Sequence, residues 1–412
     1  MARYLEDWLK SYMAYTAHNE SPDIFHFWAG VSAVAGALRR KVYIDQVYWR
    51  WYPNFYIVLV APSGIAAKSA AITNARKILK EVPGIHFGPS VMTWQSLLPA
   101  FEEAQEDSAE GLMSCLTFIT TELGTLLDPE DRKMVDVLTN LWDGFDDEFD
   151  KMTKGTGHEI AYRPWINWLS GTTPIWWSEN MGRTATEGGL GSRVIPVYAD
   201  SKRQLIAYIK RRVPPDLEKL REALVHDLED ISLLSGEYTL TEEAYKYGEQ
   251  WYEKLYEEQR TRLAGTFDGY ISRKQGHVHK VAMVLSAAKR GDLVIDMEDL
   301  KTAIALLDSI EPDMLKVVAF SGKDPQSERV GDLIKLMKGH RQLTKQALYR
   351  LLFTRTGMSG DDYERAVQSA LSAGVLRQEI IGSRNLLIYM GTSQPAEEPP
   401  DTLHSSLDKS ES

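Results

Sequence analysis

Two hydrophobic periodicities alternate along the first half of the chain, and the alternation predicts an α/β fold. Apolar side chains recur at helical spacing in residues 4–13 and 25–38, which predicts two helices. The unbroken apolar run at residues 55–60 is typical of a strand buried on both faces of a parallel sheet. The same reasoning predicts strands at 42–44, 116–120, 165–169 and 194–198, and helices at 70–81, 91–104 and 134–142. Strands that alternate with helices indicate a parallel sheet with helices on its faces.

The second half of the chain is mainly helical and ends in a small unit of its own. Helices are predicted at residues 217–234, 241–263, 269–290 and 297–318, and a linker at 321–325. Three short helices (327–338, 344–352 and 361–373) and a hairpin (375–390) then predict a winged helix. These patterns divide the chain into a helical N-terminal segment (1–48), an α/β core (49–213), a helical domain (214–320), the winged helix (327–391) and an acidic tail (392–412) that is predicted to be disordered.

Charge is unevenly distributed along the chain. The 412 residues carry 47 basic and 58 acidic side chains, a net charge of −11. Residues 327–391 hold ten basic and six acidic residues, so this region is +4 and the remainder −15. The overall balance argues against a histone-like protein coated in nucleic acid, but a basic module on an acidic body is compatible with local DNA contact.

The composition also limits the compartment. No apolar stretch approaches the roughly 20 residues that span a bilayer, and residues 1–7 lack a signal-peptide pattern. Cys115 is the only cysteine, which excludes a disulfide within the chain and a zinc module built from several cysteines. We therefore expect a cytoplasmic protein without membrane contact.

A loop of small residues at 61–69 joins the predicted strand 55–60 to the predicted helix 70–81. Strand, loop, Lys-Ser and helix is the order of a P-loop, whose backbone N–H groups surround phosphates, whose Lys contacts the β- and γ-phosphates and whose Ser holds Mg²⁺. Ala67 replaces the second glycine of the usual motif and Pro62 replaces the first. The alternative is a Ser-Gly turn that precedes a helix containing a lysine. The candidate nucleotide-binding residues are Ser63, Gly64, Ala66, Ala67, Lys68, Ser69 and Ala70.

Polar residues follow the next two predicted strands. Glu122 is in the position of the base that activates water, and Thr121 is in the usual position of an Asp that supports Mg²⁺ together with Ser69. Thr172, after strand 165–169, could hydrogen-bond the γ-phosphate or the attacking water. The alternatives are an ordinary Glu at a helix N-terminus and a turn that is satisfied by its own hydroxyls.

Two sets of basic residues are candidates for further contacts. Arg193 ends a glycine-rich run at 187–193 and suits an arginine finger that acts on a neighbouring subunit, with a surface arginine as the alternative. In the helix 269–290, one face carries Arg273, Lys274, His277 and Lys280, which could contact nucleotide or DNA.

The predicted winged helix supplies the candidate DNA-binding residues. Its third helix would be the recognition helix, and Arg365, Arg377 and Arg384 would face the phosphates. The alternative is a module that binds only protein.

The order of these motifs resembles that of the P-loop ATPase/helicase domains of bacteriophage and mobile-element replication modules. The resemblance covers roughly residues 5–320 and is carried by residues 54–69, 120–127, 142–144, 166–174 and 188–198. It implies a RecA/AAA+-like P-loop NTPase core with a helical lid, which forms ring-shaped hexamers, binds ATP and Mg²⁺ between subunits and moves along single-stranded DNA. Lys68, Ser69, Glu122, Thr172 and Arg193 fall on the family's motif positions. Such domains often accompany primase-polymerase domains, so a separate primase or polymerase is an expected partner in a bacterial or phage-infected cell.

Two functions are therefore expected as alternatives. One is an ATP-driven DNA helicase or translocase. The other is a replication initiator or helicase loader, in which the winged helix binds an origin duplex and ATP switches assembly. The residues Ala67 and Thr121, which depart from the usual pattern, favour the second.

Overall fold

A five-stranded sheet forms the centre of the first of two units. The computed structural model describes residues 3–89, 91, 93–128, 131–144, 148–153, 157–187, 189–262, 268–321, 325–372, 375–381 and 384–390. The chain divides into Met1–Gly322 and Lys323–Ser412. The strand order in the first unit is β4 (Gln105–Ser108), β5 (Gly111–Ile119), β8 (Pro164–Thr172), β3 (Tyr56–Val60) and β9 (Val194–Tyr198). All neighbours are parallel except β4, which pairs antiparallel with β5 at one edge. The predicted mixed α/β class is confirmed.

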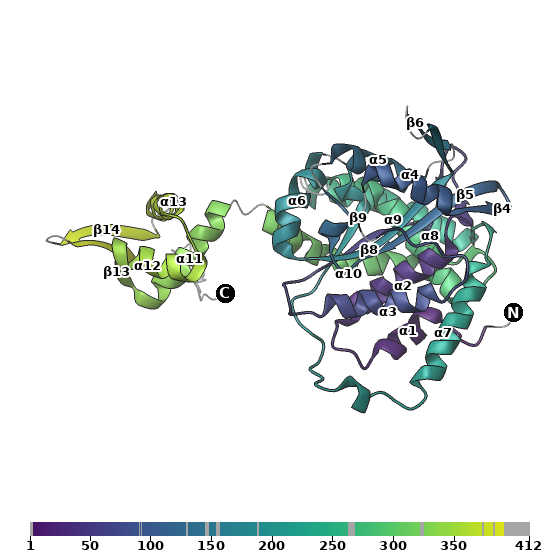
Figure 1. Cartoon of the computed structure of the whole chain (residues 1–412), viewed down its shortest axis with the longest axis horizontal. Coiled ribbons are helices and arrows are strands. Elements are labelled where there is room, and N and C mark those ends of the chain that lie inside the picture. Colours follow the sequence, from purple (N-terminus) through teal and green to yellow (C-terminus); the bar gives the residue numbers. More distant parts are fainter. Residues whose placement is uncertain are drawn as a thin grey trace, which may run out of the picture. The chain divides into compact units, whose positions relative to one another are not determined.

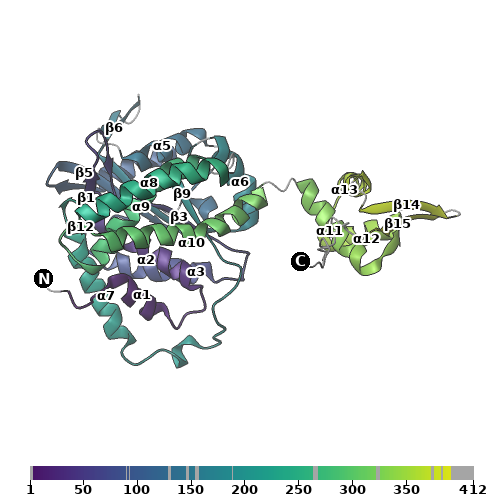
Figure 2. The same ribbon diagram turned by 180° about the vertical axis from the view of Figure 1, so that it is seen from behind.

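Helices cover both faces of this sheet (Figures 1 and 2). Ile57 and Leu59 of β3 belong to one hydrophobic cluster, and Tyr56, Val58 and Val60 belong to another, because successive side chains of a strand point to opposite faces. The first cluster includes α1 (Trp8–Thr16), α2 (Asp23–Leu38), α3 (Lys68–Lys80), α7 (Leu217–Ser232), α9 (Asp268–Lys289) and α10 (Met297–Ser321). The second includes α4 (Trp94–Glu103), α5 (Arg132–Asp143) and α6 (Pro174–Glu187). One cluster therefore runs across the sequence boundaries drawn at 48/49 and 213/214.

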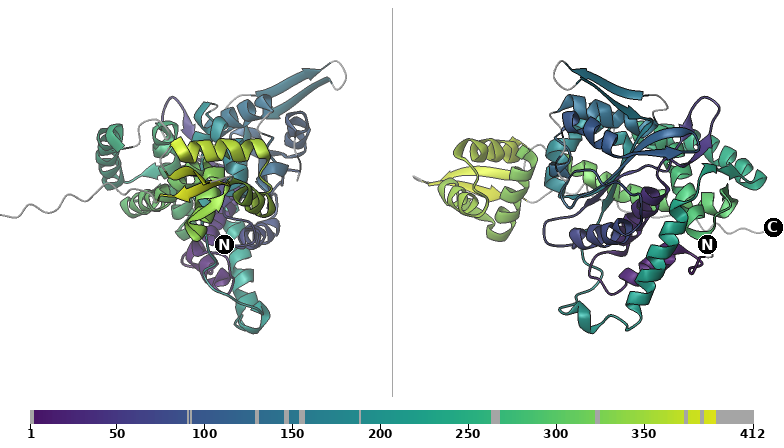
Figure 3. Two further views of the ribbon diagram at one scale, coloured as in Figure 1. Left: turned by 90° about the vertical axis from the view of Figure 1, so that its left-hand side faces the viewer. Right: turned by 45° about the vertical axis from the view of Figure 1, so that its right-hand side comes forward.

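Several smaller elements surround the sheet. The strands β1 (Val42–Asp45) and β2 (Arg50–Trp51) form a hairpin that also pairs with β10 (Gly236–Glu237), and β11 (Thr239–Leu240) pairs with β12 (Val294–Ile295). The hairpin of β6 (Glu148–Thr153) and β7 (Gly157–Tyr162) projects from the body (Figure 3). The helix α8 (Glu242–Arg262) packs on α10. Within the described residues, no helix combines the length and apolar character that crossing a bilayer would require.

The structure differs from the sequence prediction mainly between β5 and β9. The helix α6 and the hairpin β6–β7 were not predicted, and β8 continues to Thr172 where a turn was expected after residue 169. Pro174 is the first residue of α6, a position where its missing N–H costs nothing, so it starts a helix rather than interrupting the chain. The polar residues Ser170 and Thr172, which were expected in a turn, lie instead in the buried end of β8.

The second unit contains three helices and an antiparallel sheet. Its order is α11 (Pro325–His340), β13 (Gln342–Thr344), α12 (Lys345–Thr356), α13 (Gly360–Ser372), β14 (Leu376–Ile381) and β15 (Arg384–Tyr389). The strands β14 and β15 form the predicted hairpin, and β13 pairs with β15. A separate core of leucines, methionines and Tyr363 joins the helices to this sheet. The predicted disordered tail (392–412) lies outside the described residues.

Candidate phosphate-binding site

The loop between β3 and α3 places Lys68 at the first position of a helix. Its Nζ donates a hydrogen bond to the backbone carbonyl of Ala61, 2.7 Å away, so the side chain folds back across the loop toward the end of β3. Partial burial lowers the pKa of Lys68, and the charge of Glu122 opposes this shift. The ammonium group is therefore held over the loop and lies within electrostatic reach of Glu122.

Ala67 has an unusual conformation for a residue with a side chain. Its φ of 48° and ψ of 39° are left-handed, and it precedes α3 without a side-chain cap for the first N–H groups of the helix. Left-handed geometry costs a non-glycine residue roughly 1–2 kcal/mol. A strained residue and an uncapped helix N-terminus are features of an anion site, because backbone N–H groups and the helix dipole both favour negative charge.

The remaining loop residues differ in exposure. Ser63, Gly64 and Ser69 are exposed, whereas Ala66 is buried and its carbonyl accepts a hydrogen bond from Ser21. Gly64 has a φ of +72°, and a β-carbon there would meet no atom within 4 Å. Ala70 is half-buried in the first turn of α3. Of the residues expected to contact phosphate, Ser63, Gly64 and Ser69 therefore lie on the open side of the loop.

Glu122 follows β5 at the same edge of the sheet as the loop. Because β3, β5, β8 and β9 are parallel, their carboxyl ends meet at one edge, which we call the carboxyl edge. The backbone N–H of Glu122 donates to the Thr120 hydroxyl at 3.1 Å, which fixes the turn, and Thr121 and Glu122 are exposed. This edge is where ligands bind in open α/β sheets.

The central strand β8 separates the two sequence motifs. Its last residue, Thr172, is buried, and its carbonyl accepts a hydrogen bond from the backbone N–H of Ala61 at 3.3 Å. Gly171 lies beneath the turn of Thr121. The structure thus brings Lys68, Glu122 and Thr172 to one edge, with Thr172 beneath the surface.

Arg193 lies at the other end of the sheet. Its neighbour Val194 pairs with Tyr56 at the start of β3, so Arg193 is a full strand, roughly 13 Å, from the phosphate loop of its own chain. The guanidinium is buried, forms an ion pair with Asp143 and donates to the Gly189 carbonyl at 2.8 Å. A finger role can only be exercised in trans, and it would require the pair with Asp143 to open. That role stays a prediction.

Lys280, which the sequence predicts to contact nucleotide or DNA, is instead buried close to Arg193. Lys280 donates to Asn54 Oδ1 at 2.8 Å and to the Trp142 carbonyl at 3.1 Å, and its Nζ lies 3.4 Å from the centre of the Trp142 ring. Burial lowers its pKa well below the usual value. Lys274 and His277, on the same helix, are buried as well, and Arg273 is half-buried, so most of the basic face predicted to contact nucleotide or DNA is turned into the fold.

The predicted DNA-binding residues of the second unit have mixed environments. Arg365 forms an ion pair with Asp362 at 2.9 Å, and Arg377 pairs with Glu379. The side chain of Arg384 lies outside the described residues. Among the described side chains, the exposed arginines Arg350 and Arg355 of α12 form no ion pair with an acidic residue, so α12 offers more unpaired positive charge than the predicted recognition helix.

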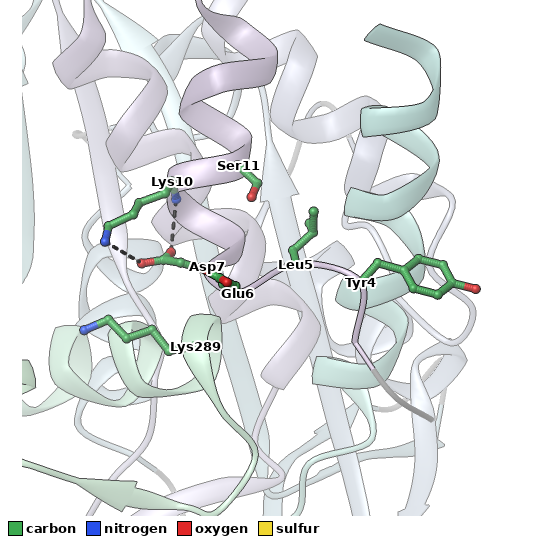
Figure 4. A pocket seen from close by; sticks show the side chains of 7 residues that line it. All are labelled: Tyr4, Leu5, Glu6, Asp7, Lys10, Ser11 and Lys289. Carbon is green, nitrogen blue, oxygen red and sulfur yellow. Dashed lines mark hydrogen bonds and ion pairs between the residues drawn. The ribbon is translucent and has the colours of Figure 1, made fainter. Parts of the chain in front are cut away.

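A separate hollow of about 570 Å³ lies at the start of the chain (Figure 4). Asp7 caps α1 by accepting from the Lys10 N–H at 3.0 Å, and the Lys10 ammonium approaches the same carboxylate. The lining residues are Tyr4, Leu5, Glu6, Asp7, Lys10, Ser11 and Lys289. None of the predicted site residues lines this hollow.

Comparison with known proteins does not add to this geometry. The chain matches no protein-family model, and a search of curated proteins gives no significant match.

Proposed function

We propose that this protein is an ATP-dependent DNA helicase or translocase of a phage-type replication module, which hydrolyses ATP at the subunit interfaces of a ring. One observation carries the proposal: Lys68 and Glu122, which follow two different parallel strands, lie at the same edge of the sheet, where the charge of Glu122 opposes the lowering of the Lys68 pKa. A phosphate-binding lysine and a carboxylate that can accept a proton from water are the two charged groups that nucleotide hydrolysis requires.

The strand order supports a RecA/AAA+-like core. Those ATPases also place a third strand between the strand of the phosphate loop and the strand of the acidic residue, as β8 lies between β3 and β5 here. The helices on both faces are consistent with the same arrangement.

The residues of the loop fit a bound triphosphate. The Lys68 ammonium already donates a hydrogen bond to a backbone carbonyl. A phosphate oxygen could take the place of that carbonyl, so the charged group would keep a hydrogen-bond acceptor when nucleotide binds. The exposed hydroxyls of Ser69 and Thr121 would hold Mg²⁺, directly and through water, and the ion would neutralise charge on the phosphates. Few protein ligands are needed, because Mg²⁺ usually keeps several waters.

Each residue has a defined task in this proposal. Lys68 binds the β- and γ-phosphates, and Glu122 orients the attacking water and accepts its proton. The buried Thr172 holds the base of the loop through its carbonyl, so its contribution is to position the loop. Arg193 of one subunit would neutralise charge at the nucleotide of the next.

The test compares two variants with a matched control. Lys68→Ala should lose nucleotide affinity and turnover, whereas Glu122→Gln should bind a fluorescent ATP analogue normally and lose phosphate release. Lys80→Ala, an exposed lysine at the far end of α3, should behave like wild type. Wild-type hydrolysis rates in Lys68→Ala would remove the assignment, and lost nucleotide binding in Glu122→Gln would make Glu122 a structural residue.

The second candidate is an ATP-switched initiator or helicase loader that binds origin DNA. It is favoured by the element order of the second unit, three helices followed by a hairpin with β13 between the first two, which is that of a winged helix. Phosphate release with and without single-stranded DNA separates the two: strong stimulation supports a motor, and slow turnover that depends on duplex supports a loader.

A further inference from the structure

The chain leaves the sheet after β9, at the carboxyl edge, and then forms an exposed basic loop. We define it as residues 205–212, Leu-Ile-Ala-Tyr-Ile-Lys-Arg-Arg. Tyr198 pairs with Val60, and the N–H of Ala199 donates to the Val60 carbonyl at 3.1 Å, so the chain leaves the sheet beside the start of the phosphate loop. From there it runs along the outside of α1 and α3 to α7 (Figure 1).

A polar network fixes the base of the basic loop. The carboxylate of Glu20 pairs with Lys202 at 2.6 Å and accepts from the backbone N–H of Ile206 at 2.8 Å. Gln204 donates to the carbonyl of Ala17 at 2.8 Å. The Ile206 side chain is buried, so the loop begins from a fixed point.

On both sides of the anchor residue Ile206, the basic loop presents apolar and cationic side chains to solvent. Leu205 is 80% exposed and Tyr208 is 71% exposed. A 3-10 turn at Ile209–Arg211 carries the cations, and the guanidinium of Arg211 lies 5.6 Å from the centre of the Tyr208 ring. Lys210, Arg211 and Arg212 are all exposed, and none of them forms an ion pair with an acidic side chain of the described residues.

This composition fits a single-stranded nucleic acid. Three adjacent exposed cations, none of which forms an ion pair with a described acidic residue, concentrate positive charge at one place on the surface, and such a concentration favours binding of a polyanion. An exposed tyrosine beside them supplies a surface on which an unstacked base can lie, and such stacking is open only where bases are free of a duplex. The exposed tyrosine beside the cations therefore favours single-stranded nucleic acid over a duplex.

We infer that the basic loop is a contact site for single-stranded DNA, in which Lys210, Arg211 and Arg212 bind phosphates and Tyr208 stacks on a base. The inference rests on the proposed function for the identity of the nucleic acid. Glu20, which anchors the basic loop, is adjacent to Ser21, whose hydroxyl donates to the Ala66 carbonyl of the phosphate loop, so one short segment contacts both loops.

The test measures, by fluorescence anisotropy, the binding of a fluorescein-labelled oligothymidylate of about 20 nucleotides. The salt concentration is varied from roughly 50 to 200 mM, because the salt dependence of the binding constant reports the number of phosphate contacts. The triple variant Lys210→Ala, Arg211→Ala, Arg212→Ala should bind at least about tenfold more weakly and lower the slope of log K against log salt by about 2. Tyr208→Ala should weaken binding about tenfold without changing the slope, and Tyr208→Phe should bind like wild type.

A control triple, Lys80→Ala, Lys219→Ala, Lys246→Ala, removes the same charge from three other exposed positions and should leave the slope near the wild-type value. Thermal melting checks that each variant folds. An unchanged affinity and slope in the basic-loop triple would overturn the inference, as would equal losses in the control triple. Binding to anionic vesicles but not to the oligonucleotide would replace DNA by a lipid surface and overturn it as well.

These binding measurements use no nucleotide, so their outcome does not depend on whether the protein hydrolyses ATP. If the basic loop binds the oligonucleotide but the Lys68→Ala variant hydrolyses ATP at the wild-type rate, this inference stands and the proposed function is wrong.

Discussion

Gly171 lies directly beneath the backbone of Thr121: a β-carbon at position 171 would be only 2.7 Å from the Thr121 carbonyl oxygen. Real β-carbons do not approach a backbone oxygen this closely, so the glycine allows the turn that carries Glu122 to rest on the end of β8. The position of the proposed base therefore depends on the absence of a side chain on the neighbouring strand.

Gly171→Ala should displace Glu122 more than it displaces Lys68. Overpacking at a buried site costs roughly 1–3 kcal/mol, and here the strain acts on the turn at Thr121. We expect nucleotide binding to persist while ATP turnover falls at least tenfold. The matched control is Gly339→Ala, since a β-carbon at position 339 would meet no atom within 4 Å. Normal turnover in the first variant would show that the turn can shift without cost.

Ala67→Gly should stabilise the protein. The left-handed backbone at residue 67 strains an alanine, and glycine removes that strain, so the free energy of unfolding should rise by about 1 kcal/mol. Ala66→Gly, at a neighbouring buried residue without a positive φ, should instead lower it by a similar amount. Urea unfolding followed by tryptophan fluorescence measures both, because all eleven tryptophans precede residue 252 and report the first unit. Equal destabilisation by both changes would contradict the assignment of strain to Ala67.

The sequence predicted the frame of this molecule better than its contacts. The strand at residues 55–60 and the helices 25–38 and 217–234 were predictable because a few neighbouring residues determine their periodicity. The placement of Lys68 and Glu122 at one edge follows from parallel strands alone. The burial of Arg193 and Lys280 was not predictable, because their partners Asp143 and Asn54 lie 50 and 226 residues away. The left-handed backbone of Ala67 was also not predictable, although the sequence showed that an alanine replaces the glycine of the usual motif at this position.

Arg193→Ala should lose ATP turnover in a way that subunit mixing can restore. Arg193 and the phosphate loop lie at opposite ends of the sheet, so an arginine finger must serve a neighbour. Mixing Arg193→Ala with Lys68→Ala would create interfaces with an intact loop from one subunit and an intact finger from the other, and partial turnover should return. The control mixes Lys68→Ala with Glu122→Gln, which damage the same site in each chain and should give no recovery. Absence of recovery in the first mixture would leave Arg193 as a structural partner of Asp143.

His26→Leu should flatten the loss of stability in acid. Burial, with a smaller effect of the Arg203 charge, lowers the pKa of His26 to about 4, and neither ring nitrogen has a hydrogen-bond partner among the described residues. Above pH 6.5 the imidazole is neutral in both the folded and the unfolded chain. Between pH 6.5 and 4 only the unfolded chain takes up the proton, so the free energy of unfolding falls as the pH falls, by up to about 3 kcal/mol from this residue.

The leucine cannot take up that proton and fills a similar volume, so its advantage over histidine should be small at pH 7.5 and should grow toward pH 4.5. Urea unfolding of both proteins across this range, again by tryptophan fluorescence, gives the two pH profiles. His277 and His279 have pKa values lowered by burial to about 3 and about 4, and they keep part of the slope in the variant. Two parallel profiles would mean that His26 is protonated equally in both states and is therefore open to solvent in the folded protein.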